Sequence, residues 1–257
     1  MEKLLQLNAI VVSGDLNEPP ISSPQLTHVK LDVTSWQQLS DFFKKANDLH
    51  GRIDHAFANA GIGPTTSYLD EDFDKAGNLL EPKTRTLDVN LKACINTVYL
   101  ALHYMKRQKN GGSVVITASA SSIQGFRAAD YGVAKHGVYG LMRNLAVQLH
   151  PELPIRINCL APMWTATGMV HGKDMNKALG VTIQTAQTVA DSAILLMADE
   201  SRHGQCIYSD AGKYWEIEQG LLVKAARQLT MTGGTLEEGI VKAAANPGTY
   251  AGQDIET

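Results

Sequence analysis

The stretch from Gly112 to Leu149 places the tightest limits on how this chain can fold. Residues 113–117 form a short apolar run behind the Gly111-Gly112 pair, which predicts a buried strand. Residues 131–149 then carry apolar side chains at helical spacing, which predicts a helix with one buried face. A strand that passes through a short loop into a helix is typical of α/β folds built on a parallel sheet.

Two polar side chains on this helix suggest chemistry. Tyr131 and Lys135 are four residues apart, so they share a helix face. An ammonium group beside a phenol favours the phenolate and lowers the phenol pKa. A serine hydroxyl at the end of the preceding strand, from Ser119 or Ser121, would help to hold a substrate oxygen against the phenol. A tyrosine and a lysine at this spacing are more often a surface pair, so the pattern alone does not decide the role.

Length, charge and composition exclude several classes of protein. The chain has 257 residues, which suffices for one α/β domain with a sizeable core. Its net charge is −3 and no Lys/Arg stripe occurs, so we expect no nucleic-acid partner. No apolar run approaches the roughly 18 residues that span a bilayer, and no signal peptide is visible. Three widely spaced cysteines predict neither disulfides nor a metal site, which fits the cytoplasm.

Further motifs follow the same alternation of strands and helices. Apolar strands are predicted near residues 9–15, 28–33, 52–58, 154–162 and 204–212, with helices over 36–49, 85–105 and 187–197. Asn59-Ala60-Gly61 follows one strand, and Leu87-Asp-Val-Asn90 lies in the long helix. With the Tyr131-x-x-x-Lys135 motif and its upstream serine, the chain resembles the short-chain dehydrogenase/reductase family from about residue 4 to 220.

The resemblance implies a Rossmann-like α/β fold with a doubly wound parallel sheet, as one domain over residues 1–257 with a C-terminal extension at 221–257. It implies an oxidoreductase acting on CH–OH groups, with a homodimer or homotetramer paired through the helices at 85–105 and 131–149. It also implies a mobile lid over the substrate at residues 168–181, although the composition there fits a plain surface loop equally well.

The family's catalytic roles fall on four residues. Tyr131 would be the acid/base, Lys135 would depress the phenol pKa and hold the nicotinamide ribose, and Asn90 would bend its helix and complete a proton relay. The family serine commonly lies thirteen residues before the tyrosine, where this chain has Ala118. We therefore assign the role to Ser119, with a loop one residue shorter, and keep Ser121 as the alternative.

The resemblance also implies a set of cofactor contacts. These are Asp15, Asp32, Val33, Asn59, Ala60, Gly61, Tyr131, Lys135, Thr165 and Thr167. A carboxylate at the end of the second strand of a dinucleotide fold binds ribose hydroxyls and repels a 2′-phosphate, so Asp15 favours NAD over NADP, although Asp15 equally suits a turn. Met163 replaces the glycine that the family usually has after Pro162, which narrows the space beside the nicotinamide.

One family element is missing from the sequence. A dinucleotide fold opens with a strand, a glycine-rich turn and a helix, whereas residues 1–7 look like the end of that helix with no such turn before them. We therefore expect an N-terminally truncated sheet and the loss of the main pyrophosphate site. The strands at Ala9 and Ile53 would be left with unpaired edges. Either the strand at Ala9 moves over to pair with the strand at Ile53, or another segment or chain fills the gap between them.

Two functions are consistent with these residues. The first is an NAD-dependent oxidoreductase, with NADP possible, that interconverts a secondary alcohol and a ketone on a small, moderately apolar molecule. The second is a family member without redox activity, which would be a cofactor-free isomerase, dehydratase or cyclase, or a binding partner. The missing glycine-rich turn and Met163 favour the second function, while Asp15, Asp32 and Asn59 favour the first.

Overall fold

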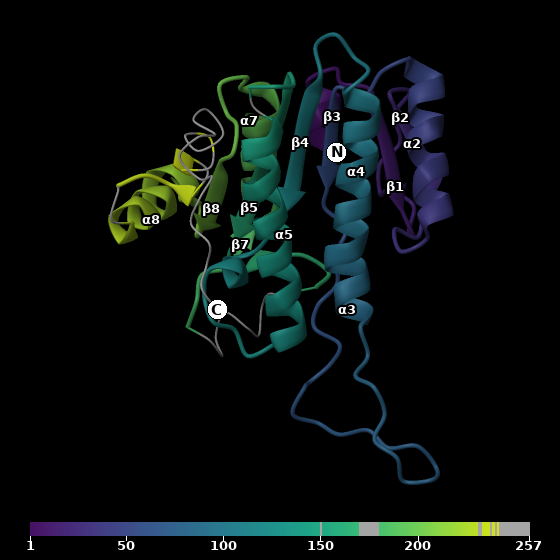
Figure 1. Ribbon diagram of the computed structural model, residues 1–257. Helices are drawn as coiled ribbons and strands as arrows, with labels where there is room; N and C mark the ends of the chain where they lie inside the picture. The colour runs from purple at the N-terminus through teal and green to yellow at the C-terminus, as the bar shows by residue number, and fades with distance from the viewer. Residues whose placement is uncertain (150, 170–179, 231–232, 237, 240, 242–257) are drawn as a thin grey trace, which may run out of the picture. The chain divides into compact units, whose positions relative to one another are not determined.

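A computed structural model describes residues 1–149, 151–169, 180–230, 233–236, 238–239 and 241 (Figure 1). The chain divides into two compact units, Met1–Trp215 and Glu216–Thr257, and each is described by itself. Most of the predicted lid at residues 168–181 lies outside the described residues. The assignment of residues 1–257 to a single domain stays a prediction.

Parallel strands form the centre of the first unit. The larger sheet has the order β3-β4-β5-β8-β9, made of His55–Ala58, Gly112–Thr117, Ile155–Pro162, Cys206–Asp210 and Lys213–Glu216. The first four of these strands are parallel to their neighbours. Two smaller parallel sheets pair β1 (Val11–Asp15) with β2 (Leu26–Lys30) and β6 (Thr165–Ala166) with β7 (Gln184–Thr185). The predicted α/β class is confirmed.

Helices cover both faces of the larger sheet. The helical segments of the first unit are α1 (Glu2–Gln6), α2 (Trp36–His50), α3 (Arg85–Leu87), the π-helix η1 (Asp88–Lys92), α4 (Ala93–Met105), the 3-10 turn η2 (Ala120–Ser122), α5 (Ala129–Leu149) and α7 (Ala186–Ala198). Helices α4 and α5 lie side by side on one face, and α7 lies on the other (Figure 1). No helix in the described ranges is long and apolar enough to cross a membrane.

The turn into β4 depends on Gly111. Its φ angle is +58°, in the left-handed region that favours glycine. A β-carbon added at Gly111 would lie 1.9 Å from the Pro154 carbonyl oxygen, so no other residue fits without moving the backbone. The strand that follows is fully buried, because Val114, Val115 and Ile116 are each 0% exposed. The predicted turn and buried strand are both present.

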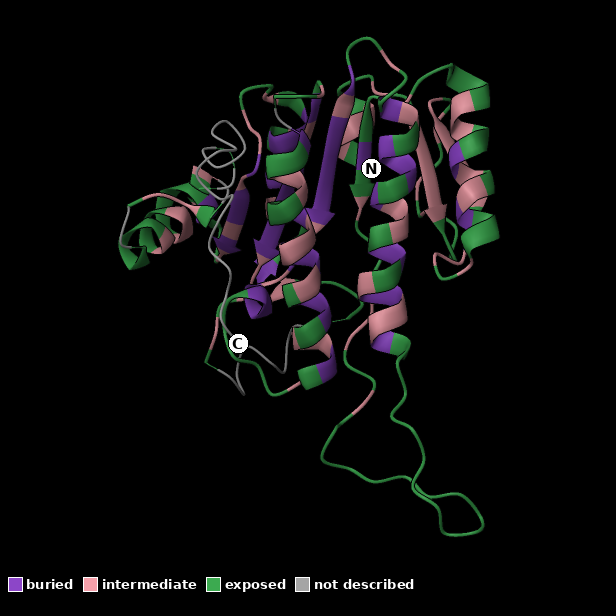
Figure 2. Cartoon of the chain, in the orientation of Figure 1, coloured by how far each residue is buried: buried purple, intermediate pink, exposed green. Residues whose placement is uncertain are grey.

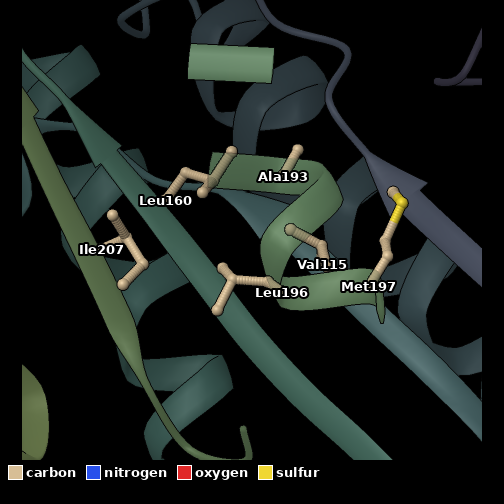
Figure 3. Close-up of a cluster of buried hydrophobic side chains, with 6 residues drawn as sticks. All are labelled: Val115, Leu160, Ala193, Leu196, Met197 and Ile207. Carbon is tan, nitrogen blue, oxygen red and sulfur yellow. The ribbon is translucent and has the colours of Figure 1, made fainter. Parts of the chain in front are cut away.

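A compact apolar cluster fixes α7 on the sheet (Figure 3). Its members come from β4, β5, β8 and α7, and they are Val115, Leu160, Ala193, Leu196, Met197 and Ile207. Leu4 of α1 packs against the same cluster, and Lys3 forms an ion pair with Asp191 of α7. The side chains of this cluster hold together elements that are up to about 200 residues apart in the chain.

The gap predicted between the two sheets is present. Within the described part of the chain, β1 is paired only with β2, and β3 is paired only with β4. The first predicted arrangement, in which the strand after Ala9 moves over to pair with the strand after Ile53, is therefore not observed. Strand β1 packs closely against its own neighbours instead, since a β-carbon at Gly14 would lie 2.5 Å from Leu31 and 3.0 Å from Phe42 of α2. Phe57 on the β3 edge is 39% exposed.

The segment between β3 and α3 is long and mostly exposed. It extends away from the sheet (Figures 1 and 2) and carries one antiparallel bridge, between Phe73 and Leu79. Its first residues remain close to the body of the unit, where Thr65 and Thr66 are hydrogen-bonded to buried side chains.

The second unit contains short helical segments. These are the π-helix η3 (Glu218–Leu222) and α8 (Val223–Leu229). Thr235 and Glu238 form a capping box, because the Glu238 backbone N–H donates to the Thr235 hydroxyl and the Thr235 N–H donates to the Glu238 carboxylate.

Candidate active site

The carboxyl ends of three neighbouring strands converge on one edge of the larger sheet. Asn59 follows β3, Ser119 follows β4 and Thr165 follows β5. Because these strands are parallel, their carboxyl ends meet at the same edge, which is where open α/β sheets bind ligands. Helix α5 begins at this edge and adds Tyr131 and Lys135.

Tyr131 and Lys135 point toward each other. The Lys135 Nζ lies 5.7 Å from the centroid of the Tyr131 ring. The same Nζ donates a 2.7 Å hydrogen bond to the Thr117 carbonyl oxygen at the end of β4. Lys135 is only 4% exposed, so its charge is surrounded by protein. The structure therefore brings the buried cation and the phenol to one place.

Of the nearby serines, Ser119 is the one that reaches the phenol. The Ser119 side chain lies near enough to the Tyr131 phenol to act on its pKa, which it lowers. Ser119 also caps η2, where its oxygen accepts from the Ser121 backbone N–H at 3.2 Å. Ser122 is turned to the Lys135 carbonyl, to which its hydroxyl donates at 2.8 Å. The buried Ser121 hydroxyl has no partner within the described ranges.

The electrostatics correct one expectation drawn from the sequence. Burial raises the pKa of Tyr131 above its ordinary value, and the hydrogen bond from Ser119 acts in the opposite direction but is weaker. The predicted acidic phenol is therefore wrong for this structure. The reason is that Lys135 is itself desolvated, which lowers its pKa to about 8, and its Nζ is directed at Thr117.

The buried Lys135 leads to a prediction on stability. Its pKa is about 8 in the fold and 10.5 ordinarily, so between these values the unfolded chain keeps a proton that the folded chain has released. The free energy of unfolding should therefore rise with pH across this window, by about 1 kcal/mol per pH unit. Lys135→Met should flatten this rise, measured by urea denaturation from pH 7 to 10.5. Lys44→Met, which changes an exposed lysine in an ion pair, should keep the wild-type slope of unfolding free energy against pH. A Lys135→Met variant that also keeps this slope would contradict the prediction.

Asn90 lies in the π-helix that interrupts the long helix. Its side chain is 1% exposed. The amide oxygen accepts from the Ile62 N–H at 2.8 Å, and the amide nitrogen donates to the Ile62 carbonyl at 2.9 Å. A β-carbon at Gly61 would lie 3.3 Å from the Asn90 Oδ1 and 3.8 Å from the Lys135 Nζ. The glycine of the Asn-Ala-Gly motif therefore leaves a space at which Asn90 and Lys135 meet.

The remaining predicted residues near β3 and β5 lie around this centre. The Asn59 Oδ1 accepts from the Thr117 hydroxyl at 3.0 Å, and Ala60 is exposed beside it. The Thr165 hydroxyl donates to the Met163 carbonyl at 2.8 Å and accepts from Gln184 at 3.3 Å. Thr167 is exposed.

Three predicted cofactor residues lie at the ends of the smaller sheet, apart from the catalytic group. Asp15 is exposed at the end of β1 and accepts from the Asn17 N–H at 2.9 Å, as a turn residue does. Asp32 accepts from the backbone N–H and the hydroxyl of Thr34, and these bonds lower the pKa of its carboxyl group. Val33, beside it, is half-buried.

These residues fit one half of a nicotinamide cofactor better than the other. Lys135 and Asn90 meet beside Gly61 and supply a buried cation and a polar amide, the kinds of group that suit a ribose and a nicotinamide. In the described part of the chain, no glycine-rich turn lies between β1 and β3 to hold a pyrophosphate. The described residues also include no group of three or more His, Cys, Asp or Glu side chains that could hold a metal ion.

Sequence reasoning missed two features of the site. The first is Asp130, whose buried carboxylate is hydrogen-bonded to three segments. The second is an aromatic wall made of Phe126 and Trp164, in which the Phe126 ring centroid lies 6.1 Å from those of both Tyr131 and Trp164. The available signals were an acidic residue immediately before the predicted helix and aromatic residues next to the motifs.

Comparison with known proteins agrees with this geometry. The model of the family described as short chain dehydrogenase matches residues 12–178. The Short-chain dehydrogenase/reductase ascJ of Acremonium egyptiacum is 44% identical over 243 residues, covering 91% of this chain and 82% of ascJ. The (+)-borneol dehydrogenase 1 of Salvia officinalis is 32% identical, covering 69% and 70%. Two further relatives, from Stachybotrys chlorohalonatus and Penicillium rubens, are matched over 56% and 45% of their own length.

A solved structure shows the same fold. The carveol dehydrogenase from Mycobacterium avium, in complex with NAD, superposes with a TM-score of 0.64 at 24% identity, over 78% of this chain and 87% of that one. The fold of the first unit is thus one that another protein uses to bind NAD.

Proposed function

This chain belongs to the short-chain dehydrogenase/reductase family of oxidoreductases, and from that premise we propose that it interconverts a secondary alcohol and a ketone with NAD. The observation that carries the proposal is the group formed by Ser119, Tyr131 and Lys135, in which the Ser119 side chain acts on a phenol whose ring centroid lies 5.7 Å from a buried ammonium nitrogen. Such a group moves a proton to or from a substrate oxygen.

Each residue has a defined part in this chemistry. A bound nicotinamide would supply the hydride exchange. The Tyr131 Oη would give its proton to a carbonyl oxygen or take one from an alcohol, and the Ser119 hydroxyl would hold that oxygen. The Lys135 ammonium, which donates to the Thr117 carbonyl, would hold the nicotinamide ribose. Asn90 would hold the Ile62 backbone beside Lys135.

The walls of the site favour an apolar substrate. The Phe126 ring meets the Tyr131 ring at 6.1 Å and 72°, and on its other contact it meets the Trp164 ring at 6.1 Å and 70°. Phe126 is 44% exposed, which leaves apolar surface for a ligand to cover. We therefore favour a small cyclic alcohol or ketone, consistent with the borneol specificity in the name of one relative.

One observation favours the function without redox chemistry. Among the described residues, β1 is paired only with β2 and β3 only with β4, and no glycine-rich turn is present between these two pairs of strands. The serine, tyrosine and lysine would then serve a cofactor-free isomerisation or dehydration, in which Tyr131 moves a proton within one substrate.

Titration with NADH, followed by its fluorescence, separates the two functions. Micromolar binding together with NADH consumption on a panel of cyclic ketones supports the dehydrogenase. A folded protein that does not bind NADH supports the cofactor-free function instead.

The choice between NAD and NADP gives a further prediction. Asp15 is exposed at the end of β1, where its charge would repel a 2′-phosphate. Asp15→Ser should lower the preference for NADH over NADPH about tenfold, since two like charges about 4 Å apart repel by roughly 1–4 kcal/mol at a protein surface and tenfold corresponds to ~1.4 kcal/mol. The ratio of the two Kd values measures it. Asp48→Ser, on α2, is the control, and an unchanged ratio in Asp15→Ser would remove Asp15 from cofactor selection.

A further inference from the structure

Asp130 is a buried acid beside the catalytic tyrosine. It is the second residue of α5 and is 1% exposed, although aspartate is almost never fully buried without partners. None of the catalytic roles described above uses it. Its position immediately before Tyr131 raises the question of what its carboxylate does.

Both oxygens of the carboxylate are used. The Oδ1 accepts from the Tyr131 backbone N–H at 2.7 Å. The Oδ2 accepts from the Thr65 N–H at 2.9 Å, the Thr66 N–H at 3.1 Å and the Thr86 hydroxyl at 2.7 Å. The set of Asp130, Thr65, Thr66 and Thr86 is called the Asp130 clamp below.

The clamp joins three segments that each carry part of the site. Tyr131 begins the catalytic helix. Thr65 and Thr66 follow directly on the loop that starts with Gly61 and Ile62. Thr86 lies in α3, which runs directly into the π-helix with Asn90. One carboxylate therefore connects the helix of the phenol to the loop and the helix that surround Lys135.

The charge of Asp130 is stabilised by these contacts. Burial by itself would raise the pKa of the carboxyl group, but the hydrogen bonds from Thr86, Thr65, Tyr131 and Thr66 together lower it. Bonds to an ionised acceptor are about twice as strong as those between neutral groups. A carboxylate in the first turn of a helix also interacts favourably with the helix dipole. The clamp is therefore a rigid, fully paired junction.

We propose that Asp130 is a positioning residue, which holds Tyr131 in register with Asn90 and the Ile62 loop through the Asp130 clamp. The proposal rests on the proposed function in one respect, that Tyr131 transfers the proton. Asp130 itself does not touch the reacting atoms. It acts through the Tyr131 backbone and through Thr86.

Variants that remove single contacts test the proposal. Asp130→Asn keeps the shape of the side chain, but its amide group then faces one of the N–H or O–H groups that donate to the carboxylate in the wild type. Thr86→Val removes the hydroxyl that donates to the Asp130 Oδ2. We expect kcat to fall at least tenfold in the first and several-fold in the second, with the Kd for NADH within twofold of wild type. Thr86→Ser keeps the hydroxyl and should restore wild-type kcat. Asp199→Asn is the matched control, because Asp199 accepts similar bonds from Ser201 and Arg202 at the end of α7.

A second measurement does not depend on turnover. Titration of the Tyr131 phenol, by NMR of ¹³Cζ-labelled tyrosine, should show a midpoint that moves toward the ordinary value of ~10 in Asp130→Asn and Thr86→Val. Loosening the start of α5 admits water to a phenol whose pKa burial has raised. The midpoint in Asp199→Asn and Thr86→Ser should not move.

The outcomes separate this proposal from the proposed function. Unchanged midpoints in both Asp130→Asn and Thr86→Val overturn the positioning role, whatever the activity. A shifted midpoint in a protein that neither binds nor oxidises NADH supports positioning while the dehydrogenase function fails. If Asp130→Asn does not fold, the Tyr131 midpoints of Thr86→Val and Thr86→Ser are compared, and equal midpoints overturn the positioning role.

Discussion

Tyr131→Phe is expected to lower kcat by about 10²–10⁴-fold, the range typical of the loss of a general acid/base. The variant removes only the Oη, which lies near Ser119, so the proton can no longer pass between the substrate oxygen and this side chain. The ring, which meets Phe126 edge to face at 6.1 Å, is retained. The Kd for NADH should stay within a few-fold of wild type, because Lys135 and Asn90 are untouched.

The measurement is steady-state oxidation of NADH on the best ketone of the panel, with circular dichroism as the test of folding. Tyr99→Phe, at an exposed position on α4 with 63% exposure, is the matched control and should keep wild-type kcat. A Tyr131→Phe variant that keeps more than a tenth of wild-type kcat would show that another group transfers the proton, and Tyr131 would lose its assigned role.

The largest expected effect on stability comes from Leu196→Ala. Leu196 is 0% exposed and lies in the cluster of Figure 3, between α7 and the sheet. Its truncation removes buried apolar area and leaves a cavity among residues of three strands, which typically costs 2–5 kcal/mol in free energy of unfolding. The loss should be near the upper end, because neighbouring side chains on rigid parallel strands cannot collapse into the space.

The chain offers a close control for this variant. Leu195 precedes Leu196 on α7 but is 42% exposed, so Leu195→Ala should change the free energy of unfolding by less than about 1 kcal/mol. Urea denaturation followed by tryptophan fluorescence suits the test, because Trp36, Trp164 and Trp215 all lie in the first unit. Equal losses in the two variants would mean that α7 does not pack as the structure shows.

Local patterns were enough to predict most of the elements. The apolar run before Thr117 predicted β4, and the Trp36 helix begins after Ser35, whose hydroxyl accepts from the Gln38 N–H as a capping residue does. The four-residue spacing predicted that Tyr131 and Lys135 share a helix face, and the π-helix around Asn90 coincides with the bend implied by the resemblance. These features depend on residues close together in the chain, where periodicity and capping act directly.

Long-range contacts decided the rest. The choice of Ser119 over Ser121, the raised pKa of Tyr131 and the Asp130 clamp all depend on burial and on which groups face each other after folding. In the clamp, Thr65 and Asp130 are 65 residues apart.

The sequence by itself determined which residues could do the chemistry and which segments carry them, because residue type, spacing and local propensity act over one or two turns of chain. Only the tertiary structure decided their charges, their partners and the gap between β1 and β3. The physical reason is that desolvation and hydrogen bonding between distant segments exist only once the sheet and its helices are packed.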